Sequence, residues 1–271
     1  MTTRKMVFVD TSKCTGCKAC PVACKAWNEL PAEKTQLVTS FQTHKDFTPN
    51  TFTYITFTEK YENQKNIWLT RKAQCFHCAD PACMKACPQK AIYQTDSGYV
   101  LVDQDKCIGC GYCATNCPFG VPKVDEVKKK AFRCVGCIDR VENDLVPACV
   151  HTCGPGALSF GERDAKMAEA KKRLAEVQKT NPKAQLYGEK EMGGTTFVYL
   201  LMDSPEAYGL PVNPTIPLSL TLWKDGIQPL FKYVWPATAC AVVIGGISNL
   251  LQGNYRNRGH EENDSKKGGK H

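Results

Sequence analysis

The amino-acid sequence predicts an α+β fold in which two small cysteine-rich units are nested one inside the other, followed by one apolar helix. Three observations predict it. Sixteen of the seventeen cysteines fall into four quartets. A motif that joins a short apolar strand to a quartet occurs twice, at 9–17 and at 102–110. Near the C-terminus, residues 233–251 contain no charged side chain.

The quartets are short runs that each supply four thiol side chains. Their members are Cys14, Cys17, Cys20 and Cys24; Cys75, Cys78, Cys83 and Cys87; Cys107, Cys110, Cys113 and Cys117; and Cys134, Cys137, Cys149 and Cys153. The first and third read C-x2-C-x2-C-x3-C, the bacterial ferredoxin pattern, in which three thiolates bind one [4Fe–4S] cluster and the fourth binds another. A proline after Cys87 and after Cys117 extends the match. Four cysteines per cluster predict four [4Fe–4S] clusters.

Disulfide bonds and structural zinc are the alternative uses of so many cysteines. Disulfide frameworks are typical of short secreted chains, whereas this chain has 271 residues, is 42% hydrophobic and can bury a core unaided. Zinc favours two separated C-x2-C pairs around one tetrahedral ion, and only Cys134 and Cys137 suggest that arrangement. The spacing of the other cysteines favours iron–sulfur clusters.

The elements next to the quartets follow from two internal repeats. The motif at 9–17 and 102–110 predicts a strand that leads into each ferredoxin run. Cys87 to Ile92 resembles Cys153 to Leu158, and both predict a cluster ligand followed by the start of a strand. These are the halves of ferredoxin-like units, so two units with two clusters each are expected.

Other segments have secondary-structure signals of their own. Residues 51–58 alternate apolar and polar side chains over most of their length, and 67–70 can pair with them in a β-hairpin. Residues 162–180 are rich in Ala, Glu, Lys and Arg and predict a surface helix that ends before an Asn-Pro pair. Residues 195–202 are expected to form a strand. Four prolines in 205–217 then predict an extended connection.

These signals divide the sequence into successive parts. They are an outer ferredoxin-like unit at 1–30 and 131–161, a hairpin insertion at 31–70, an inner ferredoxin-like unit at 71–130, a helix, strand and proline-rich connection at 162–229, a transmembrane helix at 230–252, and a charged tail at 253–271.

The uncharged run at 233–251 predicts one membrane anchor. As a helix it would span about 28 Å, close to the thickness of the hydrocarbon core of a bilayer. Tyr233 and Trp235 at one end and Tyr255 at the other match an aromatic belt. A buried core helix is the alternative, but such helices rarely precede a charged tail. Cys240 lies in this run without partner spacing, so we expect a small apolar residue and not a ligand.

Flanking charge predicts the direction of the anchor. Five basic residues follow the run and two precede it, which by the positive-inside rule puts the tail in the cytoplasm and the cysteine-rich part on the outer, periplasmic face of the plasma membrane. The first ten residues lack the features of a signal peptide, so we expect export together with a partner that carries the signal. A cytoplasm-facing arrangement is the alternative.

Composition and motifs argue against nucleic-acid binding and against catalysis by this subunit. The net charge of +8 is scattered, and the run Lys128 to Lys130 has no interleaved aromatic residues. No glycine-rich nucleotide loop or H-E-x-x-H motif is present. His77 and His151 lie inside quartets, where a histidine can tune a cluster, but ordinary loop histidines are expected. The protein is expected to conduct electrons between a catalytic subunit and a membrane partner.

Several stretches resemble a known family. Those around the cysteines are 18–28, 107–119, 133–140 and 147–153. They are similar to the four-cluster iron–sulfur subunits of the molybdenum or tungsten bis-pterin oxidoreductases. Within that superfamily, 193–224 resembles the β subunit of membrane-bound respiratory formate dehydrogenase.

The resemblance implies how the ligands divide among the clusters, which spacing alone leaves open. It implies group A, Cys14, Cys17, Cys20 and Cys153; group B, Cys24, Cys134, Cys137 and Cys149; group C, Cys75, Cys78, Cys83 and Cys117; and group D, Cys87, Cys107, Cys110 and Cys113. Some relatives replace one cysteine and hold a [3Fe–4S] cluster, whereas every position here is cysteine. Gly154 after Cys153 and the longer gap between Cys78 and Cys83 are small departures from the pattern.

The implied function is electron transfer from formate, oxidised in a molybdenum or tungsten subunit, to a membrane cytochrome b and quinone. Because the quartets do not identify the active site that they serve, an electron-transfer subunit of a hydrogenase or of a sulfur-compound reductase is an alternative. A zinc-stabilised interaction or nucleic-acid-binding protein is the remote alternative.

Overall fold

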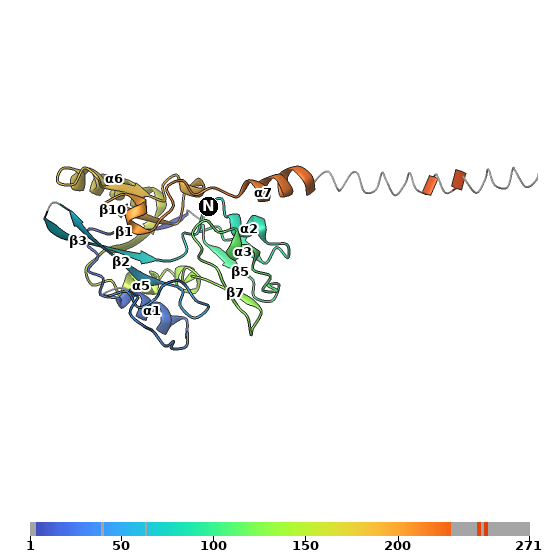
Figure 1. The fold of residues 1–271 in the computed structure, drawn as a ribbon, viewed down its shortest axis with the longest axis horizontal. Coiled ribbons are helices and arrows are strands. Elements are labelled where there is room, and N and C mark those ends of the chain that lie inside the picture. Colours follow the sequence, from blue (N-terminus) through green and yellow to red (C-terminus); the bar gives the residue numbers. More distant parts are fainter. Residues whose placement is uncertain (1–3, 39–40, 63, 229–242, 245–246, 249–271) are drawn as a thin grey trace, which may run out of the picture. The chain divides into compact units, whose positions relative to one another are not determined.

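The computed structural model describes residues 4–38, 41–62, 64–228, 243–244 and 247–248. A first compact unit comprises Met1–Pro217, and a second begins at Leu218. All four quartets lie in the first unit. The mixture of helices and strands in this unit agrees with the predicted α+β class (Figure 1).

A four-stranded sheet joins the two ends of the cysteine-rich region. Its order is β8 (Leu158–Glu162), β1 (Lys5–Asp10), β10 (Phe197–Leu201) and β9 (Gln185–Tyr187). β1 pairs antiparallel with β8 and parallel with β10. Both central strands are apolar and almost wholly buried because each face of the sheet is covered. The strand expected at 195–202 is thus a central strand of the fold.

One face of this sheet is covered by α6 (Arg163–Gln178), which confirms the helix predicted at 162–180. Met6 and Phe8 of β1 and Leu200 of β10 pack with Ala170 and Val177 of this helix. Figure 1 shows α6 lying along β1 and β10. The lysine- and glutamate-rich sides of α6 stay in solvent, which explains its weak apolar periodicity.

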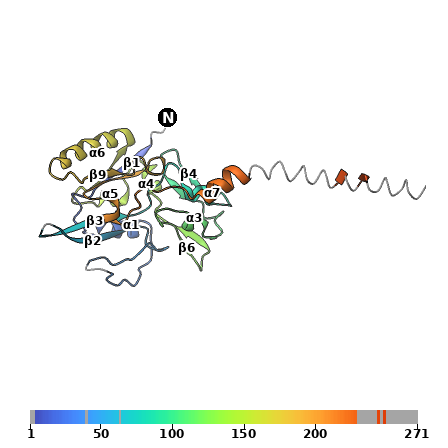
Figure 2. The ribbon, with the colours of Figure 1, turned by 45° about the horizontal axis from the view of Figure 1, so that its top comes forward.

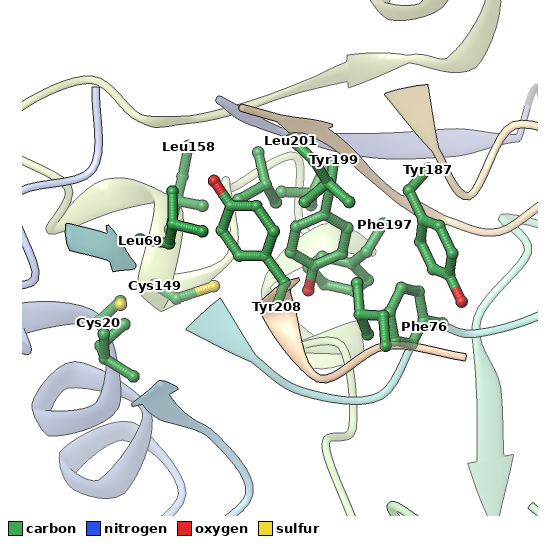
Figure 3. Packing of buried hydrophobic residues seen from close by; sticks show 14 of the residues in the cluster. Cys20, Leu69, Phe76, Cys149, Leu158, Tyr187, Phe197, Tyr199, Leu201 and Tyr208 are labelled. Atoms are coloured by element: carbon green, nitrogen blue, oxygen red, sulfur yellow. The ribbon is translucent and has the colours of Figure 1, made fainter. Parts of the chain in front are cut away.

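The opposite face of the sheet carries the larger core. Tyr199 and Leu201 of β10 are fully buried there, and Phe76 and Tyr187 pack beside them. Figure 3 shows these rings beside Tyr208, with the two cysteines Cys20 and Cys149 at one end of the same cluster. Groups A and B therefore adjoin the apolar core through these two cysteines.

The predicted hairpin is confirmed and is longer than expected. β2 (Tyr54–Glu62) and β3 (Lys65–Ala73) pair over their whole length, from Tyr54 opposite Ala73 to Glu62 opposite Lys65. The connection between the strands is therefore much shorter than the gap between the expected strands at 51–58 and 67–70. The ends of both strands nearest the core are buried and the tip is exposed, so polar residues near the tip obscured the strand pattern.

Short helices and small hairpins complete the first unit. They are α1 (Ala19–Trp27), α2 (Ala82–Ala86), β4 (Ile92–Gln94), β5 (Val100–Val102), α3 (Tyr112–Thr115), β6 (Lys123–Asp125), β7 (Lys130–Phe132), α4 (Ile138–Val141), α5 (Ala148–His151), η1 (Glu191–Gly193) and η2 (Pro205–Tyr208). α1 contacts α5, which is distant in sequence, whereas α2 contacts α3. Figure 2 shows α1 and α3 on separate sides of the unit, with β6 beside α3.

In the second unit the structure describes α7 (Leu218–Thr221) and a π-helix, η3 (Leu222–Ile227). Except for 243–244 and 247–248, the helix predicted at 230–252 lies outside the described residues, as do Cys240 and the tail at 253–271. Within the described part of the sequence, no helix is both long enough and apolar enough to cross a membrane. The membrane anchor therefore stays a prediction.

Candidate iron–sulfur cluster sites

Three of the quartets contain the turn C-x-G-C, and its glycine adopts the left-handed backbone conformation in each. The φ angles are 67° at Gly16, 68° at Gly109 and 66° at Gly136. Residues with a Cβ rarely adopt this conformation. Space is also lacking, because a Cβ on Gly136 would lie 2.2 Å from the ring of Tyr99. The glycine therefore sets the turn that separates the two flanking cysteines.

The second quartet has the same turn with His77 in place of glycine, at φ 48°. Its ring is wholly buried, with centroids 5.1 Å from Tyr99 and 5.7 Å from Phe197. Its Nδ1 accepts a hydrogen bond from the N–H of Val100 at 3.0 Å. Burial, reinforced by the charge of Arg133, holds the pKa of His77 well below its usual value. His77 is therefore a neutral core residue rather than an ordinary loop histidine, while His151 is exposed at the end of α5.

Three cavities are each lined by all four cysteines of one group, namely group A, group C and group D. Each cavity combines cysteines from different quartets. Cys153 joins the first quartet, Cys117 joins the second, and Cys87 joins the third. The cysteine that ends each run thus lies away from its nearest neighbours in sequence.

Group B comes together without a described cavity. Burial raises the pKa of Cys24 to about 12, and the nearby thiols of Cys149 and Cys137 contribute to the increase. Burial likewise raises the pKa of Cys134, with contributions from Cys24 and Cys137. These effects place Cys24 near Cys149 and Cys137, and Cys134 near Cys24 and Cys137, although residues 24 and 134 are far apart in sequence.

The donor set and its spacing fit a cluster. Within the described residues, no group of three or more His, Cys, Asp or Glu side chains is arranged to hold a single metal ion. Thiolates on one zinc ion would lie about 3.8 Å apart, given tetrahedral Zn–S bonds of about 2.3 Å. In a [4Fe–4S] cluster each thiolate binds a different iron, so the sulfurs stand farther apart around a central space. Four cysteines that surround a cavity meet this requirement.

Buried thiols and nearby donors define the electrostatics of the sites. Burial raises the pKa of Cys20 to about 12 and that of Cys113 to about 11. Without iron these thiols are protonated at neutral pH, so cluster binding must release protons. Backbone N–H groups already point at some sulfurs, as from Gly136 to Cys134 Sγ at 3.4 Å. Such hydrogen bonds stabilise thiolate charge.

The groups follow one another in the order A, B, C, D. At each junction, a cysteine of one group raises the pKa of a buried cysteine of the neighbouring group, and both cysteines lie in one buried apolar cluster. The adjoining pairs are Cys20 with Cys149, Cys134 with Cys75, and Cys83 with Cys113. Figure 3 shows the first pair side by side. The sites therefore form a row through the core.

The two ends of this row reach the surface. Of the sixteen quartet cysteines, all of which the structure describes, Cys17 and Cys110 are exposed. Cys17 belongs to group A and Cys110 to group D, the terminal groups. Every cysteine of the two middle groups is buried or half-buried. Electrons could therefore enter and leave at opposite ends of the row while solvent is kept from its middle.

Two functional candidates that sequence analysis did not single out are buried basic residues. Lys72 lines the cavity of group A and is 3% exposed, and Arg133 lines that of group C and is 5% exposed. Their closeness in sequence to Cys75 and Cys134 is the signal that could have revealed them.

Cysteine-lined sites in a buried row, carried by small units of short helices and hairpins, define an iron–sulfur electron-transfer protein. In agreement, a family model described as a 4Fe-4S dicluster domain matches residues 66–163. The formate dehydrogenase iron-sulfur subunit of Haemophilus influenzae is 40% identical over 247 residues, which cover 89% of this chain and 76% of that protein.

Two relatives from Escherichia coli extend the comparison. The iron-sulfur subunit of its nitrate-inducible formate dehydrogenase is 39% identical over 241 residues, covering 87% of this chain and 82% of the relative. A subunit of its anaerobic dimethyl sulfoxide reductase is 37% identical over 170 residues, covering 60% and 76%. The protein described here belongs to the family of formate dehydrogenase iron–sulfur subunits. It is an electron-transfer subunit of an oxidoreductase complex.

Proposed function

We propose that this subunit conducts electrons from formate, oxidised by a molybdenum or tungsten bis-pterin subunit, through four [4Fe–4S] clusters to a membrane cytochrome b and quinone. The observation that carries the proposal is the row of groups A to D, with one exposed cysteine at either end. A row with two accessible ends suits a conductor better than a storage or sensing site.

In this proposal each group holds one cluster through its four cysteines. The clusters supply one-electron transfer, and the protein supplies ligation, spacing and exclusion of water. The glycine turns orient the cysteines of each run, and the N–H donors stabilise thiolate charge. Cys17 and Cys110 mark the sites from which electrons pass to or from other subunits.

Formate is favoured over other substrates by the extent of similarity. The formate dehydrogenase subunits match 89% and 87% of this chain, whereas the dimethyl sulfoxide reductase subunit matches 60%. Residues 193–224, which carry the resemblance to formate dehydrogenase, follow the cysteine region. A sulfur-compound reductase is the second candidate, since a subunit of such an enzyme is also related.

The membrane part of the proposal is supported by the sequence. The uncharged run at 233–251 is long enough to cross a bilayer, and more basic residues follow it than precede it. We therefore propose a single-pass plasma-membrane subunit with its clusters on the outer face and its tail in the cytoplasm.

Metal analysis of the anaerobically purified complex tests the cluster assignment. Four cubanes require about sixteen iron atoms and as many acid-labile sulfides per copy of this subunit, beyond those of the partners. The co-purifying large subunit should contain molybdenum or tungsten, and formate should reduce the clusters. Zinc in place of iron would refute the cluster assignment. If all four clusters are present but formate does not reduce them, the electron-transfer role stands and formate is rejected as the electron donor.

A further inference from the structure

Arg133 is a buried cation in direct contact with the cysteines of group C. Its Nη1 donates hydrogen bonds to Cys75 Sγ at 3.4 Å and to Cys83 Sγ at 3.7 Å. Its Nε and Nη2 are buried and have no hydrogen-bond partner in the described part of the protein. Because Arg133 immediately precedes Cys134, it also stands beside group B.

Lys72 occupies a similar position one junction earlier in the row. It lines the cavity of group A, and its ammonium lies 5.8 Å from the ring centroid of Phe197. Cys20, which lines the same cavity, packs with Cys149 of group B in one buried cluster, so Lys72 lies where group A adjoins group B.

Among the residues that the structure describes, neither cation has an acidic partner. The ion pairs among the described residues join other basic side chains to carboxylates and include neither Lys72 nor Arg133. By contrast, the buried carboxylate of Asp10 is paired with Arg173 at 3.0 Å. An unpaired buried charge is strongly unfavourable, so a counter-charge is required at both sites.

Four thiolates give a bound [4Fe–4S] cluster a net negative charge, which increases by one when the cluster is reduced. A fixed cation beside the cluster lowers the energy of the reduced form more than that of the oxidised form, and burial keeps solvent from screening the effect. The two unpaired cations and the cysteine-lined cavities thus complement each other.

We propose that Arg133 and Lys72 are internal counter-charges that raise the reduction potentials of the clusters they face, Arg133 that of group C and Lys72 those of groups A and B. The inference rests on the proposed function, in which each group holds a cluster. Both residues tune the row without ligating iron. Their places at successive junctions also reduce the repulsion between electrons on neighbouring clusters.

The test is a redox titration of the intact complex, followed by electron paramagnetic resonance, for the wild type, Arg133→Gln and Arg133→Lys. Arg133→Gln keeps an N–H donor but removes the charge. One reduction step should move to lower potential by at least about 59 mV, which for one electron is a tenfold change in the equilibrium constant. Arg133→Lys keeps the charge, so each of its reduction potentials should stay within about 59 mV of the wild-type value.

Lys72→Met should shift different steps from those that respond to Arg133→Gln. The matched control is Lys106→Gln, which removes an equal charge one residue before Cys107 of group D. The side chain of Lys106 is 65% exposed, so solvent screens its charge and no step should shift.

Iron and labile sulfide, measured in every variant, separate the outcomes. A fully loaded Arg133→Gln variant with unchanged potentials would overturn the inference and leave the proposed function intact. If Arg133→Gln did not assemble its clusters, the Arg133→Lys variant would decide whether the inference holds. A shifted potential or lost clusters in Arg133→Lys would show that Arg133 is a structural residue. A wild-type protein without four clusters would instead refute the proposed function.

Discussion

Cys117 shows how a single residue connects distant parts of the molecule. It ends the third quartet in the sequence, yet it lines the cavity that Cys75, Cys78 and Cys83 of the second quartet also line. Burial raises the pKa of its thiol to about 12, and Cys75 and Cys83 contribute to the increase. Such a thiol loses its proton only when iron replaces it.

Cys117→Ser tests this connection. We expect loss or conversion of the cluster of group C, while the cluster of group D keeps its spectrum although Cys117 follows Cys113 in sequence. Electron paramagnetic resonance of the reduced complex, with iron analysis, measures both. Damage to the group D cluster alone would contradict the assignment. Cys240→Ala is the control and should leave the iron content unchanged.

Tyr199 supports the hairpin from the central sheet. Its hydroxyl donates to the carbonyl of Lys72 at 2.9 Å, and its side chain is fully buried. Tyr199→Phe should cost about 1–3 kcal/mol because the buried carbonyl loses its donor. Apparent unfolding temperatures at one scan rate should fall by about 2–4 °C per kcal/mol. Tyr61→Phe, at a site 74% exposed, should change nothing measurable. Equal effects of the two variants would contradict the prediction.

At the scale of elements, the C-x-G-C turn is the repeated unit of the sites. It recurs at Gly16, Gly109 and Gly136 with nearly equal φ angles, and His77 adopts the same conformation in the second quartet. A histidine is tolerated there because its buried ring packs between aromatic residues and accepts the N–H of Val100. Packing thus compensates for backbone strain that glycine avoids.

Gly109→Ala and Gly111→Ala separate backbone strain from loss of space. Both glycines have positive φ, but an added Cβ at Gly109 would lie 2.5 Å from the backbone of Lys129, whereas at Gly111 nothing lies within 4 Å. Gly109→Ala should therefore lose the cluster of group D, about a quarter of the iron of this subunit. Gly111→Ala should show only the conformational cost, about 1–2 kcal/mol, and keep its iron. Iron retained in both variants would show that the turn can adapt.

At the scale of the whole molecule, the row of groups has consequences for assembly. All four groups lie in the unit Met1–Pro217, which has its own sheet and core. The segment predicted to enter the membrane follows that unit in sequence. Cluster binding and membrane attachment should therefore be separable functions of the protein.

Truncation after Pro229 tests this separation. The shortened subunit should keep its clusters and, with its catalytic partner, reduce a soluble dye in the presence of formate. Electron delivery to quinone should be lost because the membrane contact is missing. The measurement compares dye reduction with quinone reduction in the same preparation. Full quinone reduction by the truncated subunit would contradict the proposed anchor.

Protease treatment tests the proposed orientation. Added to the outer face of intact cells after removal of any wall, protease should reach the cysteine-rich unit and leave a tag after His271 protected, because the five basic residues after the uncharged run are expected to hold the tail in the cytoplasm. Immunoblots for the tag and for the cysteine-rich unit measure both. Cleavage of the tag from outside would favour a cytoplasm-facing enzyme.

The sequence by itself determined the features that depend on local pattern. The ferredoxin spacing identified the cofactor because thiolates of one cluster come mainly from a single short run. The helix at 162–180 was predicted from its composition and the hairpin from its alternating pattern, because both signals lie within a short stretch of sequence. The hairpin ends were missed because contacts with the core, rather than local pattern, determine where burial begins.

The tertiary structure alone decided what depends on residues far apart in the sequence. It joined β10 to β1 in one parallel pair, brought Cys24 to Cys134, and placed the groups in the order A to D. It also buried Lys72 and Arg133 with no acidic partner in the described part of the chain. Spacing in sequence carries no record of such long-range contacts, because they depend on how the whole protein packs its sheet, hairpin and cysteine turns around one core.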